Sequence, residues 1–345
     1  MNTLNYIGSK HTLCPQIIDI ISSEIVDLDK KSFMDLFAGT GSISFRFQDL
    51  VDKCSANDLE YYSYVINTAL IKCNYSDKLQ QLIAQCNALE GIEGIVFKNY
   101  STNETCERMF FTNDNAKKCD AIRTYIDTLR IEDLINEDEY YFLLASLLVV
   151  VDKVANTSCV YGAYLKSFKS SALKPLVLIP IHTRTNLRID KNDVHHMKAE
   201  DVSKSELIFD VVYMDPPYNQ RQYSANYCPL NYIAYYDPLI NLKGKTGLIE
   251  NYNKSDFCSK VKVKNAFKVL LDNIKCRYVF ISYNNEGLLA YQELVELLSG
   301  YGALKLYKIP YKKFKAQQSV DGDSVFEYLW FVDKDMPSSF TEILK

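Results

Sequence analysis

A short apolar run that two consecutive prolines stop is the feature that most constrains this 345-residue chain. Residues 211–214, Val-Val-Tyr-Met, are β-branched, aromatic and apolar, which is typical of a buried strand. Pro216 and Pro217 have no N–H to donate to a sheet, so the strand is expected to end beside Asp215. Ligands bind at the carboxyl ends of strands in open α/β sheets, and the stop therefore predicts a binding site.

The residues at this stop suggest what the site binds. Asp215 and the carbonyl of Pro216 can both accept hydrogen bonds from one amine, and the ring of Tyr218 can stack on a flat ring. Together they predict a pocket for a planar heterocycle with an exocyclic amino group. A plain strand and turn, with Tyr218 as an ordinary packing residue, is the alternative, and other segments must decide between the two.

Residues 32–44 show the pattern of a strand, a glycine turn and a helix. Gly39 and Gly41 permit a tight turn and the close approach of a ligand, and such a unit opens a doubly wound sheet. The turn lacks the glycine spacing of a dinucleotide fingerprint and the Gly-Lys-Ser/Thr of a phosphate loop. It therefore suits a nucleoside ligand without a pyrophosphate.

A second strand is expected at residues 53–58 and ends in an acid, Asp58. Asp58 lies 17 residues after Gly41, close to the ~20 residues expected for an acid that binds ribose hydroxyls. The spacing makes Asp58 a candidate for that contact.

The regular alternation of strand and helix stops near residue 70. Residues 71–189 show helical patterns and then a polar, basic and aromatic segment, which is too long for a loop. We therefore predict an inserted domain at 71–189 and a discontinuous α/β domain formed by residues 1–70 and 190–345. Further strands are expected from apolar and β-branched patterns at residues 194–199, 208–214, 277–283, 304–309 and 325–332.

The charge of the chain is unevenly distributed. A net charge of −4 argues against a wholly basic nucleic-acid binder. No acid lies between Asp152 and Asp190, however, and the basic residues of this stretch are Lys153, Lys166, Lys169, Lys174, Arg184 and Arg188. Such a basic surface fits a polyanion, and the interleaved Tyr161 and Tyr164 favour nucleic acid. A solvated face without a ligand is the alternative.

The cysteines and apolar runs bear on the compartment. None of the ten cysteines forms a Cys-x-x-Cys pair and no Cys/His cluster has zinc spacing, so no metal site is expected. Without a signal-peptide pattern, the chain is expected to be cytoplasmic, with reduced thiols. The most apolar run, residues 140–151, is too short for a bilayer, which needs ~20 residues, so no membrane partner is expected.

Four of these segments, in this order, resemble one family. They are Asn5-Tyr6-Ile7-Gly8-Ser9-Lys10, Asp35-Leu36-Phe37-Ala38-Gly39-Thr40-Gly41-Ser42, Asn57-Asp58 and Asp215-Pro216-Pro217-Tyr218. With a long insert after Asp58, the chain resembles the Dam-like, alpha-group adenine-N6 DNA methyltransferases, which use S-adenosylmethionine. The resemblance implies an α/β fold: a doubly wound, mostly parallel sheet of seven strands with an inserted, mainly helical target-recognition domain.

The resemblance also implies roles for single residues. Asp215, Pro216 and Tyr218 match the family's catalytic motif. The family often has a further acid near the cofactor, at the place of Lys198 or Ala199 here, and Asp201 is the nearby candidate for that contact. The residues that match the cofactor motifs are Tyr6, Lys10, Asp35, Phe37, Gly39, Thr40, Gly41, Asp58 and Asp215.

The reaction expected from this resemblance is methyl transfer from S-adenosylmethionine to the N6 amine of an adenine flipped out of double-stranded DNA. The expected setting is a restriction–modification system, with a cognate endonuclease as partner. Methylation of an RNA amine or of a protein side-chain amide stays an alternative, as does a non-enzymatic nucleic-acid binder with a similar fold. The residues predicted to contact DNA are Lys166, Lys169, Arg221 and Tyr223.

Overall fold

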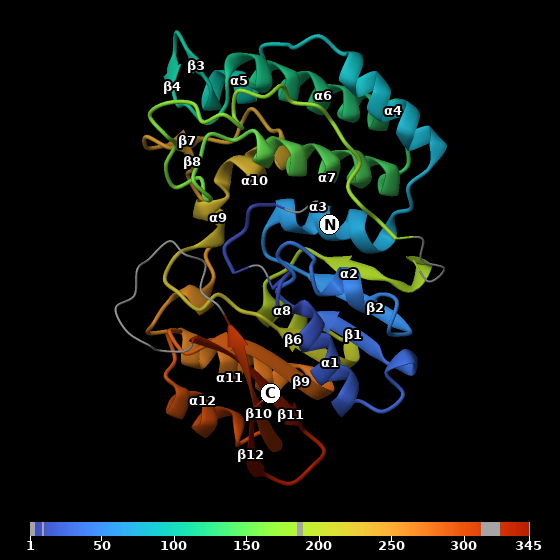
Figure 1. Cartoon of the computed structure of the whole chain (residues 1–345), viewed down its shortest axis with the longest axis vertical. Helices are drawn as coiled ribbons and strands as arrows, with labels where there is room; N and C mark the ends of the chain where they lie inside the picture. The colour runs from blue at the N-terminus through green and yellow to red at the C-terminus, as the bar shows by residue number, and fades with distance from the viewer. Residues whose placement is uncertain (1–3, 9, 185–188, 312–324, 345) are drawn as a thin grey trace.

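The computed structural model describes residues 4–8, 10–184, 189–311 and 325–344 (Figure 1). Ser9 of the N-terminal motif and Arg188 of the basic stretch lie outside these ranges. The main sheet has the strand order β12-β10-β11-β9-β6-β1-β2-β5. It is one strand wider than the seven expected, because β12 (Ser339–Leu344) pairs parallel with β10.

Five adjacent strands, from β5 at one edge of the sheet to β9, run parallel, and β11 runs antiparallel to both of its neighbours. The chain leaves β1 toward β2 on one side and later returns to β6 on the other side, which makes a switch point at their carboxyl ends. The strands are β1 (Ser32–Asp35), β2 (Lys53–Asn57), β5 (Asp193–His195), β6 (Ile208–Met214), β9 (Lys275–Asn284), β10 (Ala303–Tyr311) and β11 (Val325–Asp333).

The strand expected at residues 194–199 is shorter in the structure. It ends at His195, and helix α8 begins at Ala199. The antiparallel pair expected at residues 304–309 and 325–332 is confirmed as β10 and β11.

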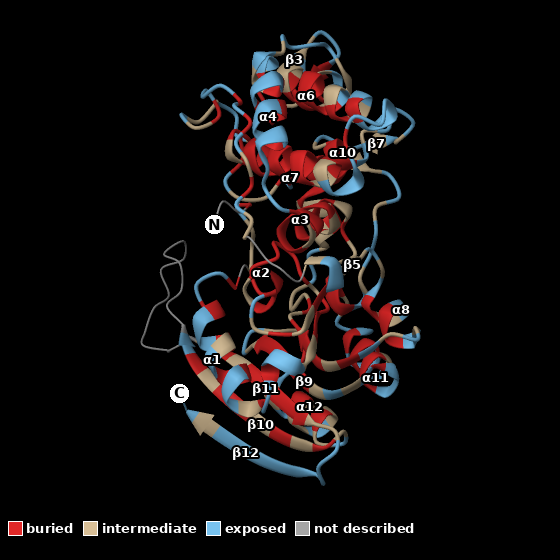
Figure 2. Ribbon diagram, turned by 90° about the vertical axis from the view of Figure 1, so that its right-hand side faces the viewer, coloured by how far each residue is buried: buried red, intermediate tan, exposed pale blue. Residues whose placement is uncertain are grey.

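Alternate residues of the strands enter two cores on opposite faces of the sheet. Phe33 and Val211 face the first core, whereas Met34 and Val212 face the second. Helices α1 (Cys14–Glu24), α2 (Ser44–Phe47) and α3 (Tyr61–Lys72) contribute to the first core. Helices α8 (Ala199–Lys204), α11 (Val263–Asn273) and α12 (Tyr291–Leu298) contribute to the second. Figure 2 shows the buried residues of the sheet between these layers.

Helices from residues 71–189 form the upper half of Figure 1. They are α4 (Asp77–Ala88), α5 (Ile95–Tyr100), α6 (Asn113–Ile131) and α7 (Glu137–Lys153). The apolar run at 140–151 is the buried part of α7, which packs on α3. No helix in the described ranges has both the length and the apolar character that a membrane span requires.

Segments that follow β6 join this helical layer. Helix α9 (Tyr223–Asn226) leads into α10 (Cys228–Tyr235), which packs on α3 and α7. Two small hairpins extend the layer: β3 (Thr102–Asn103) with β4 (Cys106–Glu107), and β7 (Leu242–Lys243) with β8 (Leu248–Ile249). The helices of 71–189 thus share one apolar core with parts of the α/β domain.

Arg123 of α6 connects this layer to α10. The side chain is 2% exposed, and its guanidinium donates to the carbonyls of Ile233 at 3.0 Å and Ala234 at 3.1 Å and to the hydroxyl of Tyr140 at 3.1 Å. Asp127 supplies the counter-charge. The guanidinium satisfies carbonyls at the carboxyl end of α10, which would otherwise be buried without donors.

We predict that Arg123→Ala lowers the free energy of unfolding by about 3 kcal/mol, because it leaves the two buried carbonyls of Ile233 and Ala234 without their donor and removes the buried part of the side chain. Arg130→Ala is the matched control: Arg130 also pairs with an acid, Glu137, but is exposed, and its loss should cost less than about 1 kcal/mol. Urea unfolding followed by circular dichroism measures both. Equal losses in the two variants would contradict the assignment.

Candidate active site

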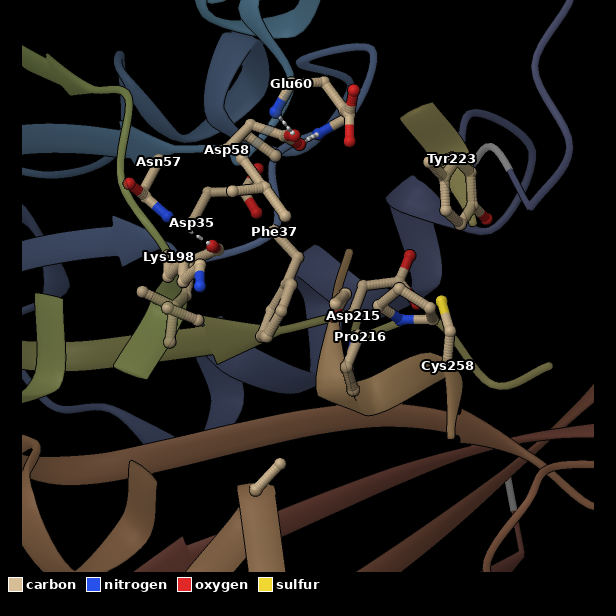
Figure 3. Close-up of a pocket in the computed structure, with 18 of the residues that line it drawn as sticks. Asp35, Phe37, Asn57, Asp58, Glu60, Lys198, Asp215, Pro216, Tyr223 and Cys258 are labelled. Carbon is tan, nitrogen blue, oxygen red and sulfur yellow. Dashed lines mark hydrogen bonds between the residues drawn. The ribbon is translucent and has the colours of Figure 1, made fainter. Parts of the chain in front are cut away.

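A cavity of about 370 Å³ lies where the carboxyl ends of β1, β2 and β6 meet (Figure 3). The N-terminal segment, α8 and the residues that follow β6 complete its walls. Its volume falls in the ~300–1,000 Å³ range of small-molecule sites. The cavity therefore lies at the switch point of the sheet, as the strand stop at Asp215 predicts.

Asp35 is the last residue of β1 and lines the cavity. Its Oδ2 accepts the N–H of Ser44, at the start of α2, at 3.2 Å. Its Oδ1 is buried and has no hydrogen-bond partner within the described residues. Burial raises the pKa of Asp35 well above its usual value, although the Ser44 N–H acts in the opposite direction. Since an unpaired buried acceptor is costly, a donor on a bound ligand is the expected partner.

The glycine turn follows Asp35. Gly39 and Gly41 have φ angles of +50° and +73°, which favour glycine. A Cβ at Gly41 would lie 2.6 Å from Leu70 Cδ1, so a side chain there would clash with α3. Gly41 thus packs closely against α3, while Gly39 and Thr40 lie in the cavity wall.

Asp58 follows β2 directly and is fixed by backbone donors. Its Oδ2 accepts the Gly39 N–H at 2.7 Å, and its Oδ1 accepts the Glu60 N–H at 2.8 Å. Burial raises the pKa of Asp58, while these N–H groups lower it. Each oxygen can still accept a second hydrogen bond, so Asp58 can bind the hydroxyls of a ribose.

Asp215 and Lys10 form an ion pair beneath the cavity. Lys10 Nζ lies 2.8 Å from Asp215 Oδ1 and 3.2 Å from Glu327 Oε1, and Lys10 is 6% exposed. Among the described residues only Lys10 donates to the Asp215 carboxylate, which leaves Oδ2 without a donor. Burial raises the pKa of Asp215 to about 6, although the Lys10 ammonium lowers it. The carbonyl of Pro216 lies past the end of β6 and outside its ladder.

A cluster of tyrosines forms another wall of the cavity. Tyr6 stacks on Tyr227 and Tyr223, with ring centroids 4.7 Å and 5.2 Å apart. The hydroxyl of Tyr62 donates to that of Tyr6 at 3.3 Å. These contacts give Tyr6 one position in the cavity wall.

The N-terminal segment 4–8 is anchored by the helical layer. The N–H of Asn5 donates to Asp152 Oδ2 at 2.7 Å, and the N–H of Ile7 donates to the Tyr227 hydroxyl at 2.8 Å. Asp152 ends the buried part of α7 and also accepts the Tyr161 hydroxyl at 3.0 Å. Residues 71–189 thus help to position Tyr6 in the cavity.

A second hollow, of about 410 Å³, lies on the other side of Tyr218 and Tyr223, which line both spaces. Its wall is polar, with side chains that can hydrogen-bond the edge of a base. These residues are Asn219, Arg221, Asn226, Asn284 and Glu286.

The structure gathers most of the predicted site residues around the first cavity. Those in its wall are Tyr6, Lys10, Asp35, Phe37, Gly39, Thr40, Asp58, Asp201, Asp215, Pro216, Tyr218 and Tyr223. Arg221 lines the second hollow, and Lys166 is exposed on the loop after α7. Lys169 Nζ donates to the Thr157 carbonyl at 2.6 Å, so this ammonium also stabilises the loop to which it belongs.

Three buried acids near the site were not predicted as site residues: Glu60, Asp152 and Glu327. Glu60 accepts hydrogen bonds from Ser224 and Asn231, and burial raises its pKa to about 7. The sequence offered one indication for Glu327, since it is the only acid in the otherwise apolar stretch 325–332. Glu60 follows Asp58 at the same strand end.

These features fit S-adenosylmethionine, the cofactor that the resemblance implies. The unpaired Asp35 Oδ1 can accept from its ammonium group, and the Asp58 carboxylate can bind its ribose hydroxyls. The glycine turn has no phosphate-loop lysine, in agreement with a ligand that lacks phosphates. No cluster of metal ligands occurs in the part of the chain that the structure describes.

Known proteins resemble the chain along most of its length. The sequence profile of a family described as "D12 class N6 adenine-specific DNA methyltransferase" matches residues 6–297. The Type II methyltransferase M.NlaIII of Neisseria lactamica is 42% identical over 337 residues, 96% of this chain and 99% of that protein. M.CviAII of Paramecium bursaria Chlorella virus 1 is 44% identical over equal shares. M.FokI of Planomicrobium okeanokoites is 36% identical over 96% of this chain but 53% of that protein.

We predict that Asp152→Asn weakens cofactor binding about tenfold, because the neutral amide replaces two charge-assisted hydrogen bonds, with the Asn5 N–H and the Tyr161 hydroxyl, by weaker neutral ones at a cost of about 1.4 kcal/mol. Titration calorimetry with S-adenosylmethionine measures the affinity.

Asp210→Asn is the matched control for this prediction. Asp210 Oδ2 also accepts two donors, the N–H and the hydroxyl of Ser32, both at 2.8 Å, but Asp210 lies outside the cavity wall. Equal affinities in the two variants would show that Asp152 does not position the N-terminal segment.

Proposed function

Because this chain belongs to the D12 class of N6 adenine-specific DNA methyltransferases, we propose that Asp215, Pro216 and Tyr218 form the site that accepts a flipped-out adenine. The chain methylates specific adenines in DNA and uses S-adenosylmethionine as its cofactor. The observation that carries the assignment of residues is the position of Asp215, which has one oxygen bonded to Lys10 and the other without a donor among the described residues.

The adenine amine needs help from the protein because its lone pair is delocalised into the ring. S-adenosylmethionine, when bound, supplies an electrophilic methyl group on a positively charged sulfur. Asp215 Oδ2 and the Pro216 carbonyl accept the two amine hydrogens, which favours a pyramidal nitrogen with a localised lone pair. The Asp215 carboxylate also stabilises the positive charge that develops on this nitrogen. With a pKa of about 6, it can then accept the proton that the nitrogen releases.

An adenine amine in a duplex lies inside a base pair, so the base must leave the helix at a cost of a few kcal/mol. Stacking on Tyr218 offsets part of this cost, at ~1–3 kcal/mol per base. The second hollow, which shares Tyr218 with the cofactor cavity, is the proposed route of the base. Arg221 and Tyr223 line it and are the proposed contacts to the base and its neighbours.

Residues 71–189 are the proposed target-recognition part. Their basic segment after α7 lies beside the proposed base site, since the N–H of Tyr161 donates to the Asn226 carbonyl at 2.7 Å. This backbone hydrogen bond joins the segment to α9, whose Tyr223 lines both the cofactor cavity and the second hollow. A DNA contact on this segment would therefore lie close to the extruded base.

Two lysines of the basic segment are the proposed phosphate contacts. Lys166 is exposed and can reach a phosphate without leaving a partner among the described residues. Lys169 shares that role, although one of its N–H groups is bonded to the Thr157 carbonyl. Lys166 is therefore the clearer residue for a test of DNA binding.

A cognate restriction endonuclease is the proposed partner. Support comes from the relatives M.NlaIII and M.CviAII, both described as Type II methyltransferases, and from a relative described as the modification methylase StsI. Protection of methylated DNA from cleavage by candidate endonucleases tests the partnership.

We also infer a cytoplasmic location, because all ten cysteines are free thiols, as a reducing compartment favours.

We predict that Asp215→Ala lowers methyl transfer to DNA by about a thousandfold or more, because the amine loses its charged acceptor. Transfer of labelled methyl from S-adenosylmethionine to unmethylated plasmid DNA measures this, and the wild type should place the label in adenine. Calorimetry of cofactor binding checks that the variant is folded. Full activity of the variant would refute the mechanism, whereas label in RNA or protein alone would favour those substrates.

We predict that Lys166→Ala weakens DNA binding and reduces the slope of log affinity against log salt by about one, because one phosphate contact is lost. Lys30→Ala is the control, since Lys30 is equally a surface lysine but pairs with Asp27 ahead of β1, away from the cavity. Fluorescence anisotropy at several salt concentrations gives both slopes. An unchanged slope in the Lys166 variant would remove this segment from the DNA interface.

A further inference from the structure

Glu327 is a buried acid in strand β11, where its neighbours on the same face, Leu329 and Phe331, are core residues. It is 7% exposed. Its Oε1 accepts the hydroxyl of Ser282 on the adjacent strand β9 at 2.5 Å and lies 3.2 Å from Lys10 Nζ. A buried acid in an apolar strand is costly unless it is paired, so this position requires an explanation.

Lys10 lies between two carboxylates, Glu327 and Asp215. Burial alone would lower the pKa of Lys10, but the two acids outweigh burial and raise that pKa well above its usual value. The ammonium therefore stays charged between the two acids. The shorter contact, at 2.8 Å, is to Asp215 Oδ1.

We propose that Glu327 is a positioning residue for methyl transfer: it shares the Lys10 ammonium with Asp215, so that the ammonium occupies Oδ1 alone and Oδ2 stays free for the adenine amine. The inference rests on the proposed role of Asp215. Without Glu327, the three N–H groups of Lys10 have a single buried carboxylate to satisfy them, and the ammonium moves toward both of its oxygens. The amine then meets an acceptor that is already occupied.

Glu327 also affects how readily Asp215 takes a proton. Burial raises the pKa of Asp215 most, the Lys10 ammonium lowers it, and the negative charge of Glu327 raises it again. The other titratable groups that face Asp215 are Asp35 from β1, Tyr213 from β6, Tyr218 after it and Tyr223 from α9. These groups are unchanged when Glu327 alone is replaced.

The test is Glu327→Gln, which keeps the shape and an acceptor for Ser282 but removes the charge. In the wild type, single-turnover methylation should fall as the pH drops through about 6, because protonated Asp215 no longer accepts the amine. In the variant this acid limb should move to lower pH, since a charge that raises the pKa of Asp215 is gone. The plateau rate should fall on the order of tenfold, because the acceptor is misplaced, with little change in DNA affinity.

Glu24→Gln is the matched control. Glu24 likewise binds a lysine and a hydroxyl, those of Lys305 and Tyr307, next to the same sheet but outside the cavity wall. It should keep the wild-type acid limb and rate. An acid limb in Glu327→Gln that stays in place or moves to higher pH would overturn the proposal, even if the rate falls.

Thermal unfolding and cofactor calorimetry show whether Glu327→Gln is folded. If it is not, Ser282→Ala tests the proposed role of Glu327 instead. It removes the hydroxyl that orients Glu327, so Lys10 should move toward Asp215, and the plateau rate should fall without loss of cofactor affinity. A wild-type rate would overturn the proposal.

Asp215→Ala distinguishes a failure of the proposed function from a failure of the proposed role of Glu327. If Asp215→Ala stays active, the proposed function fails, whereas an inactive Asp215→Ala beside a wild-type-like Glu327→Gln refutes only the role of Glu327.

Discussion

The ion pair between Lys10 and Asp215 is the interaction on which the rest of the site depends. It joins the N-terminal segment to the end of a central strand, 205 positions away in the sequence. An isolated buried carboxylate tends to gain a proton and an isolated buried ammonium tends to lose one, so each group keeps its charge because of the other. The proposed acceptor for the adenine amine is thus a property of two distant segments and not of the strand end alone.

Local backbone chemistry was sufficient to predict the parallel strands and the place of the cavity at their carboxyl ends. The proline stop after Asp215 and the glycine turn at Gly39 mark two neighbouring carboxyl ends, and each depends only on its own residues. The eighth strand was missed because β12 is mostly exposed, so its residues carry no burial pattern. Glu327 was missed as a candidate because its partner Lys10 lies near the other end of the chain, and only the fold brings the two residues together.

The division into a catalytic and a recognition part is less sharp in space than along the sequence. Helix α10 comes after β6 but packs among the helices of residues 71–189, and Arg123 fixes it there. In return, Asp152 from that layer anchors the segment that carries Tyr6 into the cofactor cavity. The helical layer therefore contributes to the wall of the cavity as well as to the proposed DNA surface.

The anchoring of segment 4–8 also has a consequence for how the molecule folds. The contacts of this segment with Asp152 and Tyr227 span 147 and 220 residues of sequence. The pairing of β1 with β6, which sets Phe33 beside Val211, has a similar range, so the strand ends and the N-terminal wall both pay a large loop-closure entropy before they gain stability. The cavity is therefore incomplete until all of these distant segments have met. Cofactor binding then stabilises only the fully folded molecule, which makes it a reporter of complete folding.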